Sequence, residues 1–210
     1  MDIYASDEEK GEEIKRWWRE NGLSVVAGIA LGIAGLFGGR YWLAQQEQQV
    51  TNASTLYQQT VIYLSQNQTE QASAMVDDLI STYAATPYAA FAALEMAKQN
   101  ATAGQTDKAK TYLQWVIEQA ELPGQKDIAR LRLAKLLLDE SDYAAAMTMV
   151  SARQTEAFQS LFDEIKGDIH LAQGQTEQAN SAYQAAMADM DINEPRRVVL
   201  KLKLDDVTGS

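Results

Sequence analysis

The chain has 210 residues, no cysteine, a single histidine and a formal net charge of −11 at pH 7. Without thiols it has no disulfides, thiolate metal sites or cysteine nucleophiles. The acidic balance disfavours nucleic acid, which is bound by basic side chains that neutralise phosphates. The lone His170 belongs to no catalytic or metal-binding motif, so we expect neither an enzyme nor a cofactor or metal.

An uncharged apolar run extends from Asn21 to Gly39. As a helix it is about 28 Å long, close to the ~30 Å hydrocarbon core of a bilayer. A core helix of a soluble protein is usually shorter, and a signal peptide has only about 7–15 apolar residues. We therefore predict an uncleaved transmembrane helix over 21–42, after a tail at 1–20. Aromatic side chains suited to the membrane interface flank it: Trp17, Trp18, Tyr41 and Trp42.

Four glycines of this run share one helical stripe, because their spacing follows i, i+4, i+7 and i+11. They are Gly28, Gly32, Gly35 and Gly39. Helices in lipid associate by close backbone contact, which glycines permit. We expect this stripe to dock another membrane helix, although glycine is also common in spanning helices generally.

Basic residues are concentrated before the apolar run, among them Lys15, Arg16 and Arg19, whereas no Lys or Arg occurs between Arg40 and Lys98. Lysine and arginine near the ends of a spanning helix favour the cytoplasmic side. The tail at 1–20 is therefore predicted to be cytoplasmic. Residues 43–210 are predicted to be exported as a single domain.

The exported part is rich in Ala, Gln, Leu and Glu and lacks strand-like alternation, which predicts an all-α domain. It also repeats itself: NQTEQASAM begins at residue 67, GQTDKAKTY at 104 and GQTEQANSAY at 174, with a weaker SDYAAAMTM at 141. The intervals of 37, 37 and 33 residues approach the 34-residue tetratricopeptide period. One small residue recurs where the paired helices should pack closely: Ala72, Ala109, Ala146 and Ala179.

A first helix precedes each turn, starting near Ser54, Tyr88, Ile128 and Ala157. The helix at Ser54 is expected to continue from the spanning helix without a break. A last helix, opening at Glu194 and Pro195, is expected to cap the solenoid. The third repeat departs most from the pattern, because its turn at 141 lacks glycine and the spacing shortens afterwards, so we expect the concave surface to be least regular there.

Stacked helix pairs form a concave surface that accepts extended or helical peptides. The tyrosines and Trp115 beyond residue 43 recur at helix-packing spacings and are interpreted as core, with one or two of them expected to line the concave surface. Asp163, Glu164 and Asp168 are interpreted as an ordinary solvated acidic helix surface.

Several segments resemble the family of ancillary subunits of the bacterial SecYEG translocon, over essentially the whole chain. They read MDIY, IKRWWRENG, GGRYW, ASTLYQQTV, LRLAKLL and GQTEQANSAYQAA. The resemblance implies a single-pass bacterial inner-membrane protein with a periplasmic tetratricopeptide domain and no catalytic residues. It also implies association with SecYEG and the membrane-anchored periplasmic chaperone PpiD, and help for newly translocated chains reaching the periplasmic folding network.

The sequence therefore favours a translocon-associated adaptor or chaperone, whose partners would include SecYEG, PpiD and nascent or unfolded periplasmic polypeptides. The alternative is a self-associating membrane scaffold or regulator that acts through its cytoplasmic tail.

Overall fold

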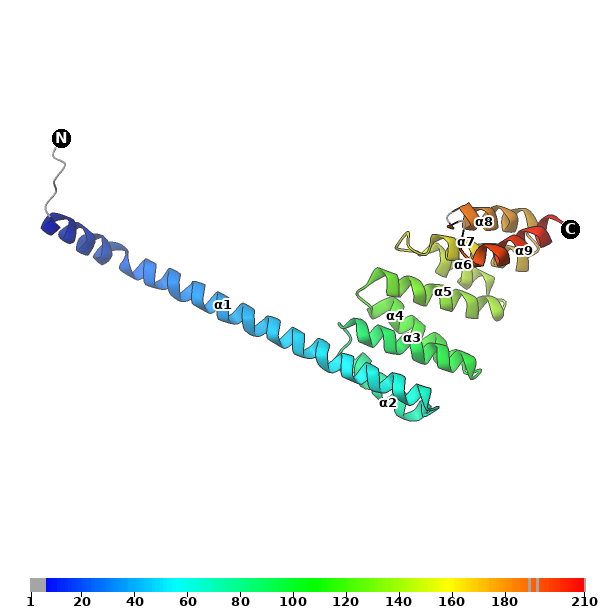
Figure 1. Cartoon of the computed structure of the whole chain (residues 1–210), viewed down its shortest axis with the longest axis horizontal. Helices are drawn as coiled ribbons and strands as arrows, with labels where there is room; N and C mark the ends of the chain where they lie inside the picture. The colour runs from blue at the N-terminus through cyan, green and yellow to red at the C-terminus, as the bar shows by residue number, and fades with distance from the viewer. Residues whose placement is uncertain (1–6, 189, 192, 210) are drawn as a thin grey trace, which may run out of the picture. The chain divides into compact units, whose positions relative to one another are not determined.

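The computed structural model describes residues 7–188, 190–191 and 193–209, and within these every regular element is an α-helix. The chain divides after Gln49 into two compact units, which are described separately. The first six residues of the predicted cytoplasmic tail lie outside the described residues. The helices are α1 (Asp7–Ser65), α2 (Thr69–Thr82), α3 (Pro87–Thr102), α4 (Thr106–Gln119), α5 (Pro123–Asp139), α6 (Tyr143–Ser151), α7 (Gln159–Ala172), α8 (Thr176–Ala188) and α9 (Arg196–Thr208), as labelled in Figure 1.

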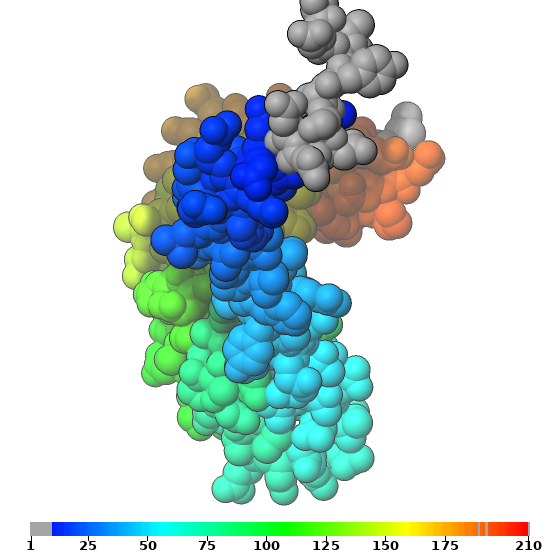
Figure 2. All heavy atoms as spheres, turned by 90° about the vertical axis from the view of Figure 1, so that its left-hand side faces the viewer, coloured from blue at the N-terminus to red at the C-terminus, as the bar shows by residue number. Residues whose placement is uncertain are grey.

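The helix predicted near Ser54 is the last part of α1, which continues unbroken from Asp7 to Ser65. This confirms that the apolar run and the first repeat share one helix. In the second unit, Val50–Ser210, this last part shares an apolar cluster with α2, and the pairs α3 with α4, α5 with α6 and α7 with α8 follow. Figure 2 shows the packed atoms of neighbouring hairpins in the same chain order.

The same turn joins the two helices of every hairpin. Its first residue has a positive φ each time: 60° at Asn67, 74° at Gly104, 63° at Ser141 and 73° at Gly174. In each turn the next amide donates to a carbonyl five residues back, as Gln105 N does to Asn100 O at 2.8 Å. This is the Schellman arrangement, which satisfies the last carbonyls of the first helix.

The turn at Ser141 corrects the expectation that the third repeat is irregular at this point. Ser141 adopts the left-handed conformation despite its side chain, and Asp142 N donates to Leu137 O at 2.9 Å as in the other turns. The Asp142 carboxylate also accepts from Ala145 N and caps α6. The third hairpin differs later, because α6 has 9 residues where α4 has 14.

Two of the three prolines start helices. Pro87 and Pro123 occupy the first turns of α3 and α5, where the missing N–H costs nothing. Pro195 is the N-cap of α9, so this helix begins at Arg196 rather than Glu194.

The core is a series of apolar clusters, each shared by consecutive helices. Ala72, Ala146 and Ala179 each lie in one of them, and these three alanines and Ala109 are fully buried. In the last cluster, Leu200 and Val207 of α9 pack beside Tyr183 of α8. α9 therefore covers the end of the last hairpin.

Candidate functional site

The stretch of α1 that the sequence predicts to span a membrane keeps its apolar side chains on its surface. Leu23, Leu31 and Phe37 expose 86%, 74% and 70% of their area. The segment Lys10–Ser65 is long and apolar enough to cross a membrane, and 6% of its most apolar window is buried among the described residues. Monomeric soluble proteins rarely leave so large a continuous apolar surface in water. The exposure favours a lipid environment over a protein core.

The four glycines of this stretch leave an open strip along α1. A Cβ atom built on Gly28, Gly32, Gly35 or Gly39 would meet no atom of the described chain within 4 Å. The strip is therefore open to the backbone of another helix.

The flanking aromatic side chains are also exposed. Trp17, Trp18, Tyr41 and Trp42 expose 53%, 52%, 75% and 61% of their area. The tail side of the run carries Lys15, Arg16 and Arg19, all exposed, with the Lys15 ammonium 3.8 Å from the Glu12 carboxylate.

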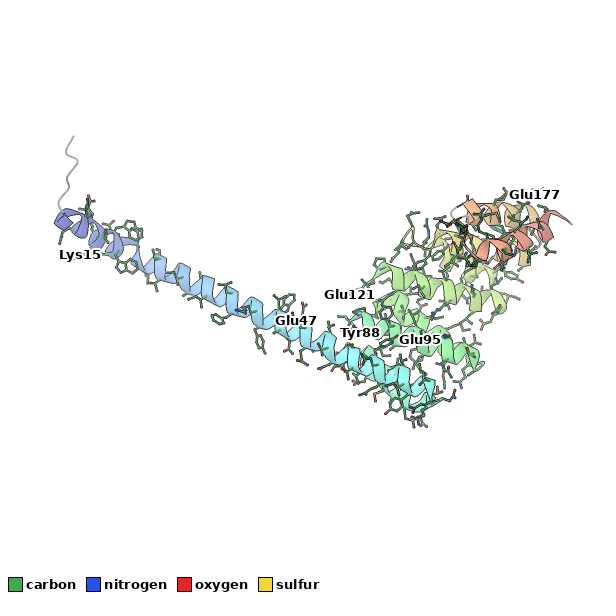
Figure 3. The ribbon with its side chains drawn as sticks, viewed as in Figure 1. Lys15, Glu47, Tyr88, Glu95, Glu121 and Glu177 are labelled. Carbon is green, nitrogen blue, oxygen red and sulfur yellow. The ribbon has the colours of Figure 1, made fainter. Side chains whose placement is uncertain are left out.

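An aromatic cluster lies on the first helices of the repeat unit. The Tyr57 ring of α1 is 5.9 Å from the Tyr88 ring and 6.1 Å from the Phe91 ring of α3. Burial, and then the charge of Glu95, raise the pKa of Tyr57. Figure 3 shows Tyr88 and Glu95 on α3. Phe91 is 39% exposed, so the cluster offers an apolar surface beside a carboxylate.

The same register continues along the first helices. Ile128 of α5 and Leu161 of α7 correspond to Phe91 in the repeat and are half-buried.

The tyrosines interpreted as core differ in burial. Tyr183 is fully buried, whereas the half-buried ones are Tyr57, Tyr63, Tyr83, Tyr88, Tyr112 and Tyr143. The half-buried tyrosines pack against the apolar clusters, and so does Trp115. Tyr183 is therefore inside the core, and the others lie at its edge.

Ion pairs attach α9 to α7. Lys203 Nζ lies 2.9 Å from Glu164 Oε1 and 2.7 Å from Asp168 Oδ1. Arg196 Nη2 is 3.0 Å from Glu164 Oε2, and the Tyr183 hydroxyl donates to Asp168 Oδ1 at 2.8 Å. The acidic cluster of α7 is therefore not the solvated surface that the sequence indicated, and Asp163 is itself buried.

We expect this attachment to weaken in acid. Burial alone would raise the pKa of Glu164, but Lys203 and Arg196 outweigh it and hold that pKa below 4.5. A carboxylate with a lowered pKa stabilises the fold above its unfolded pKa, and this contribution is lost as the pH falls through the folded pKa. Glu164→Gln should therefore reduce the free energy of unfolding by about 1 kcal/mol at pH 7.

The measurement is thermal unfolding of the full chain in detergent from pH 7 to pH 3. The difference in stability between wild type and Glu164→Gln should narrow below about pH 4.5. A difference that stays constant over this range would contradict the assignment. Lys201→Gln, at an exposed position of α9, is the control and should follow the wild-type profile.

His170 lies in the last turn of α7, with its Nδ1 2.6 Å from Gln175 Oε1. Within the described part of the chain, no group of three or more His, Cys, Asp or Glu residues could hold a metal ion.

Known proteins are similar to this chain over nearly its whole length. The family described as a tetratricopeptide repeat-like domain matches residues 15–209. A protein of Escherichia coli strain K12 named ancillary SecYEG translocon subunit is 26% identical over 99% of this chain and 100% of its own length. Proteins of the same name are 27% identical in Haemophilus influenzae, over 92% of this chain and 99% of theirs, and 25% identical in Neisseria gonorrhoeae, over 99% and 100%. These matches confirm the resemblance that the sequence motifs indicated.

Proposed function

Because this chain belongs to the tetratricopeptide repeat-like domain family, we propose that it is a membrane-anchored adaptor of the SecYEG translocon. The similarity to proteins named ancillary SecYEG translocon subunits, which extends through α1 as well as the repeats, carries this proposal. The exposed apolar stretch of α1 supports it, because an adaptor of a membrane channel needs an anchor in the same bilayer.

In this proposal residues 21–42 cross the inner membrane, the tail at 1–20 is cytoplasmic and residues 43–210 are periplasmic. The basic residues before the apolar run support this orientation. The glycine strip docks against a helix of the channel, and the repeat unit receives PpiD or a newly translocated chain. The exposed aromatic surface around Phe91 suits an apolar polypeptide segment.

Photocrosslinking in intact cells tests the membrane contact. A photoreactive residue at Gly32 is expected to crosslink to a SecYEG subunit, because its position has open space on the strip. The same residue at Phe37, about 140° away around the helix, is the matched control and should crosslink several-fold less. Recovery of a homodimer in place of channel subunits would favour the self-associating scaffold and contradict the proposal.

Substitution of the strip gives a second test. Gly32→Leu with Gly35→Leu should lower co-purification with SecYEG in mild detergent at least fivefold, because the added side chains hold the helices apart. Ile33→Ala with Phe37→Ala, both at least about 100° from each glycine of the strip, is the control and should co-purify normally. Equal recovery from both variants would show that the strip makes no contact.

A further inference from the structure

Grooves recur between successive second helices of the repeat unit. One, between α2 and α4 over α3, has a volume of about 290 Å³. The next, between α4 and α6 over α5, has a volume of about 660 Å³. The repeat register relates the two, since their lining residues correspond at intervals of 37 residues. We name the second one the α4–α6 groove; α5 lies between its two flanking helices along the stack (Figure 1).

The lining changes in character from the first groove to the second. Where the first groove has the amide of Asn100 and the ammonium of Lys108, the α4–α6 groove has Leu137 and Ala145. Methionine and tyrosine in the first are matched by further apolar side chains in the second. The apolar lining of the α4–α6 groove comprises Trp115, Leu133, Leu137, Ala145 and Met149.

Position 145 is what opens this groove. The corresponding residues of the other three hairpins are Gln71, Lys108 and Gln178, all with long side chains. Only the third hairpin has a methyl group there, so α6 contributes a short side chain to the groove at this position. Trp115 and Met149 form part of the lining, and a flexible thioether adapts to apolar groups of different shape.

Carboxylates dominate the rim. Lys110 lies on it, but its ammonium is 2.8 Å from Glu140 Oε1 and 3.1 Å from Asp107 Oδ1 and is shared between them. Glu118 lines the same groove and is exposed. Lys126 Nζ lies 3.3 Å from the carbonyl oxygen of Glu118. Around the groove three carboxylates therefore stand beside two ammonium groups, and the net negative charge attracts cations.

We propose that the α4–α6 groove binds a polypeptide segment that inserts an apolar side chain and carries lysine or arginine beside it. The apolar floor receives the inserted side chain, and the rim carboxylates pair with the flanking cations. Trp115 adds a ring face for a cation. This assignment rests on the proposed function in which the repeat unit receives polypeptides, and it names the kind of segment and where it docks.

Trp115 provides the measurement. Trp17, Trp18 and Trp42 are replaced by Phe in the full chain, held in phosphatidylcholine nanodiscs, so that Trp115 is the remaining fluorophore. A synthetic peptide with a central leucine pair and flanking lysines is expected to shift the Trp115 emission saturably. A peptide with glutamates in place of the lysines should bind at least tenfold more weakly.

Two variants locate the binding site. Ala145→Gln places over the groove the side chain that two other hairpins already carry at this register, so the fold should be kept, and binding should fall at least tenfold. Ala145→Lys should do the same. Gln178→Lys adds the same charge at the same register of α8 and is expected to bind like the parent. Equal thermal unfolding of the variants is the check on folding.

Unchanged binding by both Ala145 variants, or no saturable shift with the lysine peptide, would overturn the groove assignment. The proposed function has its own readout, the crosslink from Gly32. If Ala145→Gln abolishes peptide binding but a photoreactive residue at Gly32 gives no crosslink to the channel, the adaptor proposal is wrong. The assignment of the groove as a peptide-binding site then still stands.

Discussion

Gly167→Ala is expected to lower the free energy of unfolding by about 2–3 kcal/mol, with a fall in melting temperature of roughly 5–10 °C. Gly167 is buried in α7 against the ring of Tyr183. A Cβ atom there would lie 2.3 Å from Tyr183 Cε1 and 2.4 Å from Cδ1. The ring is fully buried and its hydroxyl is bonded to Asp168. This cost exceeds the roughly 1 kcal/mol that alanine gains over glycine within a helix.

The repeat register explains why glycine is needed here. The position of Gly167 in the other hairpins holds Thr60, Ala97 and Ala134, and the position of Tyr183 holds Val76, Leu113 and Val150. The fourth hairpin therefore combines the largest partner with the smallest. The summed volume stays suited to the closely packed helix pair.

Gly167→Ala with Tyr183→Leu recreates the Ala97 and Leu113 pair of the second hairpin. The double variant should be more stable than the sum of the two single changes predicts, by about 2 kcal/mol. Thermal unfolding of the four proteins of this cycle, as full chains in detergent, measures the coupling. Additive effects would show that the Gly167 and Tyr183 positions do not share one packing contact.

The repeating architecture could be predicted from the sequence because it depends on local signals. The Gly104 and Gly174 turns, the helix-starting Pro87 and Pro123, and the spacing of small residues each act within a few residues of the chain. A long apolar run is equally local, since length and composition alone make it a candidate membrane span.

Features that depend on contacts between distant residues could not be predicted in the same way. Ser141 adopts a left-handed conformation that its side chain disfavours, because the helices on both sides hold the turn. Glu164 and Asp168 look like surface acids until α9 brings Lys203 against them. The sequence does contain a signal for the contact between Gly167 and Tyr183. Compared with the other repeats, the side chain is smaller at the first position and larger at the second.

Asp127 shows the same limit and leads to the second large effect. It lies on α5 at the register of Ala53 and Ala90, yet its side chain is fully buried. Its carboxylate accepts from Gln154 N at 3.0 Å, Thr155 N at 2.8 Å and the Thr155 hydroxyl at 2.9 Å. Arg130 Nη1 donates to it at 3.1 Å. The first two repeats have a buried alanine at this register, and the third has Asp127 instead. The carboxylate anchors the segment that follows the short helix α6.

Asp127→Ala is expected to cost about 3–5 kcal/mol, since it leaves the buried Arg130 cation and two partly buried backbone amides without their acceptor. Thr155→Val removes one hydroxyl bond and should cost about 1 kcal/mol, which makes it the matched control. Arg153 lies in the released segment between α6 and α7, so trypsin should cut after it at least tenfold faster in Asp127→Ala than in Thr155→Val. Equal cleavage rates at Arg153 would mean that the segment is held by its own contacts. In that case the buried carboxylate would serve α5 and Arg130 alone.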